Sequence, residues 1–429
     1  MKLWDKGIAT AHKVHEFTSG NDRVLDSELA VYDVKGSIAH VKMLHHVGVL
    51  EESEQEQLVK ELNVLLHQFE TEGVEIPAQF EDIHSYVEYL LTQKLGDTGK
   101  KVHTGRSRND QVLVDLHLYS KDQLSSLKNH VKSLIDQLLT LSEQHKEAII
   151  PGYTHMQVAM PSSIGLWLGG HAEMLVDDLI WINAAYQIAD QNPLGSAAGY
   201  GSGFPLNRQM TTQLLDFKAM KVNATAAQMS RGKLEKACAI AVSSVASSLS
   251  KLAMDTCLFM SQNLGFISFP DELTTGSSIM PHKKNPDVME LVRGKCNLLQ
   301  SLPQEITLLI NNLPSGYHRD FQELKGKHIW SFKEIGQCLE MVQLMFSHLI
   351  VKQGVIEQSI YDYVFSVENL NQLVLEGLSF REAYQTVGAQ IEAGNYVPNK
   401  QLNHQHVGSV GNLGNDLIKE KMQELNKMI

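Results

Sequence analysis

Residues 234–259 read LEKACAIAVSSVASSLSKLAMDTCLF, and this stretch decides the fold class. Steps of three or four residues, the repeat of one helix face, separate Leu234, Cys238, Ala241, Val245, Leu249, Leu252, Thr256 and Phe259. The other faces carry mainly alanine and serine, whose small side chains let neighbouring helices approach closely. A helix of about 30 residues would be about 45 Å long, and a rod that is apolar or small on nearly all sides needs to be buried. The sequence therefore predicts a bundle of long helices.

Two further helical series and the placement of proline support an all-α chain. The series run through residues 124–141 and 164–186 with the same spacing. The chain has 11 prolines, and none lies within 78–150, 206–269 or 315–397. Because proline costs about 3 kcal/mol inside a helix, these stretches favour long helices. We expect the bundle to continue across subunits, and the alternative is a bundle that is complete within one chain.

Composition and charge narrow the class of protein. The 429 residues are 43% hydrophobic and 20% charged, which is the balance of a globular chain with several domains. The formal net charge of −12 argues against a general nucleic-acid binder. The four cysteines lie far apart without metal-ligand spacing, so we expect reduced thiols. With no signal-peptide pattern and no apolar run of about 18 residues, we expect a soluble intracellular protein.

Clusters of glycine, proline and serine mark the loops between the helices. They lie at 95–109, 151–161, 192–205, 269–286 and 313–316. We place domain boundaries near residues 106 and 354, which gives an N-terminal helical domain (1–106), a central bundle domain (107–354) and a small C-terminal helical domain (355–429). Loops between rigid helices often carry functional residues, so we expect the functional side chains to lie in these segments.

The loop TTGSSIMPHKKNPD (274–287) combines a hydroxyl with positive charge. Ser277 follows Gly276, where the backbone N–H groups are open to an anion. Lys283 adds a cation and Asn285 an amide. This composition suits an activated hydroxyl beside a carboxylate substrate. A solvated surface loop explains the same composition equally well.

Two other loops carry polar groups of the same kind. In KKVHTGRSRNDQ (100–111), Arg106 and Arg108 are planar donors suited to carboxylates, although this stretch also reads as the start of a helix. In GYTHMQ (152–157), His155 has a side chain suited to acid–base work near neutral pH. A lone histidine is more often structural, so the motif alone does not decide between a structural and a catalytic role for His155.

The segment PSGYHRDFQELK (314–325) adds a tyrosine, a glutamine and two lysine or arginine side chains. Each alone is ordinary surface chemistry. Together the four loops are polar and locally basic within an acidic chain, and they point to a small polyanionic substrate.

These motifs together resemble the argininosuccinate lyase family, a branch of the fumarase/aspartase superfamily. GSSIMPHKKNPD (276–287) is similar to the superfamily signature. Four further segments resemble the argininosuccinate lyases in particular: HTGRSRNDQ (103–111), GYTHMQ (152–157), SGYHRDFQELK (315–325) and LEGLSFREAYQTVG (375–388). The resemblance extends from about residue 33 to about residue 390.

The resemblance implies a fold, an assembly and a reaction. The fold would be all-α, with three domains and a central long-helix bundle, and the assembly a homotetramer whose active sites each take loops from three subunits. The reaction would be reversible elimination of fumarate from argininosuccinate to give arginine, by acid–base catalysis through an aci-carboxylate intermediate. This is a cytoplasmic step of arginine biosynthesis. No metal, organic cofactor, nucleic acid or membrane is implied.

Matching the motifs residue by residue implies the catalytic roles. Ser277 matches the general base, and His155 matches the proposed general acid, which Glu290 would pair with. Lys283 and Asn285 match residues that bind the succinyl carboxylates.

A second group of positions matches substrate-binding residues of the family. They are Ser107, Arg108 and Asn109 from another subunit, together with Thr154, Tyr317, Gln322 and Lys325. His84, in EDIHS, matches a histidine near the site at a helix start, and we do not expect it to be a catalyst.

Two positions depart from the family pattern. Asp22 stands where the family usually has a serine that contacts substrate, which changes how the amino-acid end of the substrate is held. His282 stands where glutamine is more common, and histidine there is typical of adenylosuccinate lyases. The alternatives are therefore an adenylosuccinate lyase-like enzyme and an inactive, delta-crystallin-like structural protein. The retained His155, Ser277 and Lys283 argue against the second.

Overall fold

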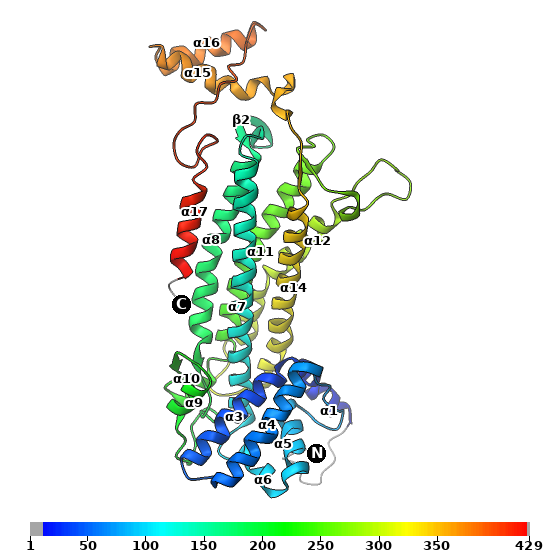
Figure 1. The fold of residues 1–429 in the computed structure, drawn as a ribbon, viewed down its shortest axis with the longest axis vertical. Coiled ribbons are helices and arrows are strands. Elements are labelled where there is room, and N and C mark those ends of the chain that lie inside the picture. The colour runs from blue at the N-terminus through cyan, green and yellow to red at the C-terminus, as the bar shows by residue number, and fades with distance from the viewer. Residues whose placement is uncertain (1–11, 427–429) are drawn as a thin grey trace. The chain divides into compact units, whose positions relative to one another are not determined.

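The computed structural model describes residues 12–426, and most of them are helical (Figure 1). The longest elements are α7 (Arg108–Gln144), α8 (Ile164–Ala189), α11 (Lys233–Met260) and α14 (Gln322–Ser347). The chain divides into two compact units built from discontinuous stretches, and each of these helices contributes residues to both units. The predicted all-α class is confirmed. The division near residues 106 and 354 stays a prediction.

Unit 1 comprises Met1–Leu127, Trp181–Ser243 and Leu299–Glu334. Besides parts of the long helices it contains α1 (His12–Ser19), α2 (Asp22–Asp26), α3 (Ala30–His46), α4 (Glu52–Glu72), α5 (Ile83–Leu95), α6 (Asp97–Lys100), α9 (Arg208–Leu214), α10 (Ala224–Gln228), α13 (Leu302–Ile310) and the paired short strands β3 (Gln191–Asn192) and β4 (Ala219–Met220). Single 3-10 turns lie at Ser27–Leu29, Lys101–His103 and Arg319–Phe321. An apolar cluster forms where α3, α4 and α5 pack fully buried side chains together, among them Val34, Leu44, Leu58 and Leu62.

The starts of α5 and α7 are fixed by aspartate side chains. Asp82 caps α5 by accepting the backbone N–H of Ser85 at 2.8 Å. Asp110, in the first turn of α7, accepts the N–H of Ser107 at 2.9 Å and also two N–H groups of the 195–197 segment. These bonds hold the two segments that carry EDIHS and HTGRSRNDQ in defined positions.

Unit 2 comprises Lys128–Ile180, Ser244–Leu298 and Ile335–Ile429. It contains the strand pairs β1 (Ile149–Thr154) with β2 (Gln157–Ser163) and β5 (Ile267–Ser268) with β6 (Ile350–Val351), most of α12 (Asp287–Leu299), and α15 (Ser366–Leu375), α16 (Phe380–Glu392) and α17 (Asn415–Asn426). Its 3-10 turns lie at Asp271–Leu273, Val355–Glu357 and Ser359–Phe365. In this unit α7 and α14 are joined by a bond from Gln137 to the backbone of Gln343, and α8 and α11 by His171 with Asp255.

Helix α11 has the burial that its sequence predicts. Every position of the apolar series from Leu234 to Thr256 is at most 1% exposed. Phe259, the last of the series, packs against Trp167 with a ring separation of 4.9 Å. By length and composition this helix could cross a membrane, but 56% of its most apolar window is buried inside the structure. That burial is expected of a core helix.

The stretch 151–161, which we expected to be a loop, lies in an antiparallel hairpin of β1 and β2. His155 and Met156 form its turn, with φ of 53° and 61°, the left-handed geometry that suits a two-residue hairpin turn. Pro151 and Pro161 lie opposite each other in the ladder. Because proline is normally confined to strand edges and loops, this pair concealed the strands in the sequence.

Candidate active site

Unit 1 contains a charged pocket with a volume of about 240 Å³. Its lining side chains come from α2, the start of α5, the start of α7, the turn before α11 and the 317–325 segment. They are Asp22, Asp26, Glu81, Asp82, His84, Arg108, Asn109, Val112, Arg231, Tyr317, Arg319, Gln322 and Lys325. Five of the predicted substrate-binding residues lie together here, namely Arg108, Asn109, Tyr317, Gln322 and Lys325. Ser107 does not line this pocket: its hydroxyl accepts the N–H of Asn109 at 3.2 Å.

Arg108 is held by acidic residues before α5. Its guanidinium lies 2.8 Å from Asp82 and 3.4 Å from Glu81, and it donates to the Ser85 hydroxyl at 2.7 Å. Burial would raise the pKa of Asp82, but the charges of His84 and Arg108 and the bonds from Ser85 outweigh it, so this pKa lies below its usual value. Asp82 therefore holds Arg108 as a carboxylate.

Lys325 is buried and carries two carboxylate partners. Its Nζ lies 2.6 Å from Asp26 and 2.8 Å from Asp22. Burial opposes its charge, but the two carboxylates raise the pKa of Lys325 above its usual value. For Asp22 burial outweighs the charge of Lys325, so the pKa of Asp22 is raised. The free pocket thus already neutralises the lysine that the sequence assigned to substrate.

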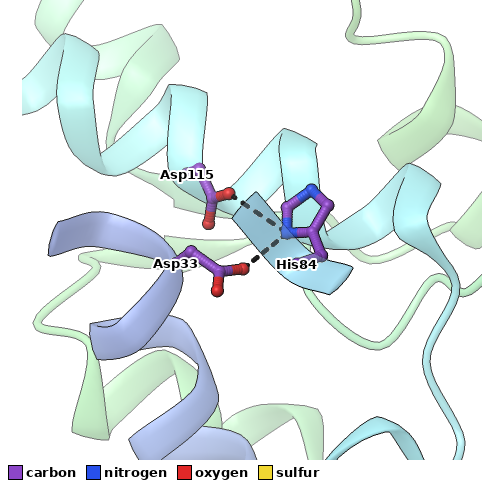
Figure 2. A group of neighbouring side chains, drawn as sticks. All are labelled: Asp33, His84 and Asp115. Carbon is purple, nitrogen blue, oxygen red and sulfur yellow. Dashed lines mark hydrogen bonds and ion pairs between the residues drawn. The ribbon is translucent and has the colours of Figure 1, made fainter. Parts of the chain in front are cut away.

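His84, at the wall of this pocket, belongs to a buried cluster of charged side chains and donates its Nδ1 proton to Asp33. Figure 2 shows its Nδ1 facing both Asp33 from α3 and Asp115 from α7, with the second ring nitrogen on the far side of the ring. The distances are 2.6 Å to Asp33 and 3.9 Å to Asp115. Burial would lower the pKa of His84, but the charge and hydrogen bond of Asp33 and the charge of Asp115 raise it to about 9. His84 is therefore an imidazolium near neutral pH.

The same three side chains carry atoms that could hold a metal ion, all within 4.8 Å of one another. The distance of 2.6 Å between His84 Nδ1 and Asp33 Oδ1 is nevertheless that of a charge-assisted hydrogen bond. Two ligands of one ion at about 2.1 Å each would lie about 3 Å apart at right angles. The geometry fits a shared proton. Burial and the charge of Asp33 raise the pKa of Asp115 well above its usual value, which reduces the negative charge of the cluster.

The signature loop lies in unit 2, where two backbone bonds between Thr275 and Asn285 close its base. The Ser277 hydroxyl accepts the N–H of Met280 at 3.2 Å and that of Ile279 at 3.4 Å. The Asn285 amide donates to the Gly276 carbonyl at 3.3 Å. The predicted base thus faces backbone donors within its own loop.

The other predicted catalytic residues of unit 2, and the predicted substrate-binding Thr154, are exposed and lie on different elements. Thr154 ends β1, His155 is at the hairpin tip, and Lys283 is in the signature loop. Glu290, on α12, has Arg293 at 4.0 Å as its ion-pair partner. Among residues 12–426 of this chain, His155 forms no hydrogen bond or ion pair with Ser277 or Glu290. The contacts that the resemblance implies stay predictions.

The sequence missed several acidic residues of the unit 1 pocket. Asp26, Glu81 and Asp82 of its wall were not singled out. Asp33 and Asp115, which contact His84 but do not line the pocket, were missed as well. A signal was present for Asp82, because an aspartate two residues before His84 marks a helix cap. Asp26 is adjacent to Lys325 only through the fold, since 299 residues separate them.

Comparison with known proteins identifies relatives of this chain. A family described as Lyase matches residues 11–300. An argininosuccinate lyase of Parabacteroides distasonis is 52% identical, covering 99% of this chain and 95% of the relative. The argininosuccinate lyase of Bacteroides thetaiotaomicron is 50% identical with the same coverage. That of Sorangium cellulosum is 40% identical, covering 92% of this chain and 91% of the relative.

Solved structures with lower identity share the fold. EDDS lyase in complex with formate has a TM-score of 0.77 at 22% identity, covering 98% of this chain and 91% of that chain. A class II fumarase from Schistosoma mansoni has a TM-score of 0.73 at 16% identity, covering 96% and 91%. At these identities the likeness establishes the fold alone.

Proposed function

Since the chain belongs to the argininosuccinate lyase family, we propose that it cleaves argininosuccinate reversibly to arginine and fumarate. The observation that carries the substrate assignment is the unit 1 pocket, in which side chains of both charges from five segments face one cavity. Argininosuccinate itself carries carboxylates, an ammonium and a guanidinium. A pocket for a simple polyanion would not need four carboxylates in its wall.

The first chemical step in this proposal is proton removal by Ser277. A serine hydroxyl is a weak base unless its anion is stabilised. The two N–H groups that point at its oxygen, from Met280 and Ile279, supply such stabilisation. Both of these donors belong to the same loop as Ser277.

Negative charge then builds on the succinyl carboxylate as an aci-carboxylate. Lys283 and Asn285 would bind that carboxylate, and preorganised donors of this kind contribute about 3–4 kcal/mol each. His155, paired with Glu290, would donate a proton to the departing guanidino nitrogen as the C–N bond breaks. Thr154 and Ser107 would contact the substrate beside these groups.

The assembly in this proposal is a homotetramer in the cytoplasm, with each site shared by three subunits. It is supported by the position of Ser277 and His155, which lie on separate exposed elements of one chain without bonding to each other. Loops from neighbouring chains would bring them to one substrate. The pathway would be arginine biosynthesis, and the reaction as proposed needs no metal or organic cofactor.

The test is the release of fumarate, followed by its ultraviolet absorbance. We expect absorbance to rise when argininosuccinate is added, and to stay flat with adenylosuccinate. Ser277→Ala should abolish the absorbance change. Ser278→Ala, at the neighbouring serine, is the matched control and should retain it. Signal with adenylosuccinate alone would favour the adenylosuccinate lyase-like alternative. Silence with both substrates from a folded protein would favour a structural role.

A further inference from the structure

The carboxylate that would pair with the general acid lies beside a single cation. Glu290 is in the first turn of α12, where its backbone N–H donates to the Pro286 carbonyl at 3.0 Å and the helix start favours an acidic side chain. The Glu290 side chain is 50% exposed, and its Oε1 lies 4.0 Å from the guanidinium of Arg293, one turn further along the helix. Among residues 12–426, no other side chain forms a hydrogen bond or ion pair with this carboxylate.

Arg293 is also attached to the neighbouring helix α11. Its other terminal nitrogen donates to the sulfur of Met254 at 3.0 Å, and 32% of its side chain is exposed. Cys257, one turn further along α11, lies close enough for the charges of Arg293 and Glu290 to act on its thiol. Burial raises the pKa of this thiol, so α11 presents two neutral sulfur groups to the pair. Within the described part of the chain, Glu290 is therefore the one carboxylate that pairs with Arg293.

We propose that Arg293 is a positioning residue for the general acid: anchored on α11, it holds Glu290 in the orientation in which this carboxylate accepts a hydrogen bond from the imidazole of His155. The inference rests on the proposed function and adds a residue to its proton-donating step. A carboxylate can orient a catalytic imidazole only if its own direction is fixed. An exposed glutamate side chain otherwise samples several rotamers.

The geometry of the pair suits this role better than a tight ion pair would. A guanidinium can bind both oxygens of a carboxylate through two parallel hydrogen bonds, which would leave little acceptor capacity for an imidazole. At 4.0 Å from one oxygen, Arg293 attracts Glu290 and leaves the second oxygen to another donor. Lysine could supply the charge but not both contacts, because its ammonium is a single point on a flexible stem.

Steady-state release of fumarate from argininosuccinate by the intact enzyme tests the proposal. Arg293→Gln should lower kcat about tenfold, which is part of the roughly 10²–10⁴-fold that general acid–base catalysis contributes. KM should stay within about twofold, because the change removes no contact to the substrate. Arg293→Lys should recover part of the lost kcat. Lys419→Gln, which removes an exposed cation from α17, is the matched control and should change neither constant.

A double-mutant cycle separates positioning from a merely structural role. If Arg293 acts through Glu290, then Arg293→Gln should lower the single-turnover rate about tenfold in the unaltered enzyme and leave the slower rate of Glu290→Gln unchanged. An equal fall in both backgrounds would overturn the inference, because Arg293 would then act independently of Glu290. Since both side chains are partly exposed, we expect all of these variants to fold.

The kinetic constants also separate this inference from the proposed function. If the unaltered enzyme releases fumarate and Arg293→Gln has the same kcat, or an unchanged kcat with a raised KM, the role of Arg293 is refuted and the proposed function stands. If the unaltered enzyme releases no fumarate from argininosuccinate, the proposed function fails, and the inference that rests on it fails as well.

Discussion

Replacing His84 with glutamine should remove a large pH dependence from the stability of the enzyme. The imidazole has a usual pKa of 6.5, which the buried cluster raises to about 9 in the folded chain. A difference of this size corresponds to about 3 kcal/mol of folding free energy. Because the folded-state pKa is the higher one, this stabilisation is fully present below about pH 6.5 and is lost as the pH rises through 9.

Urea unfolding at pH 6.5 and pH 9.5, at one protein concentration, measures this effect. We expect the free energy of unfolding to fall over this interval by about 3 kcal/mol more in the unaltered enzyme than in His84→Gln. His67→Gln, at an exposed histidine on α4, should behave like the unaltered enzyme. A difference between the two pH responses below about 1 kcal/mol, near the uncertainty of such extrapolations, would refute the buried imidazolium.

Other predictions concern catalysis and packing. Ser277→Ala should lower kcat far more than it changes KM, because it removes a proton acceptor; steady-state kinetics with an unchanged kcat and a raised KM would contradict this. Mixing inactive Ser277→Ala and His155→Asn subunits should restore part of the activity if sites are shared, and demonstrably mixed tetramers without activity would count against sharing. Gly99→Ala should destabilise the protein in thermal unfolding, because its Cβ would lie 2.5 Å from the backbone of the preceding helix. Gly388→Ala, with open space in α16, should instead stabilise it by about 0.5–1 kcal/mol; opposite signs would show that these contacts are wrong.

The long helices were predictable because their signal is local and repeated. The series from Leu234 to Thr256 needed only its own spacing, and burial follows it at every position. The hairpin at residues 149–163 was not predictable in the same way. Its strands are short, contain opposed prolines, and turn through His155 and Met156 without a glycine.

Part of the candidate site was predictable from the sequence and part was not. Residues in recognisable motifs, such as Arg108 and Lys325, were found, and the fold places them in one pocket. Their acidic partners were missed, because the pairing of Lys325 with Asp26 depends on two segments 299 residues apart. Spacing in the sequence carries no information about such a pair. The sequence therefore suggested a basic site, whereas the pocket has both signs of charge.

The turn at the tip of the β1–β2 hairpin sets two properties of the enzyme against each other. His155 and Met156 both adopt a backbone conformation that costs a residue with a side chain about 1–2 kcal/mol relative to glycine. An engineer seeking heat resistance would choose Met156→Gly and gain stability at this turn. The same exchange would make the backbone beside His155 more flexible, so the more stable protein would hold the imidazole of the proposed general acid less firmly in place.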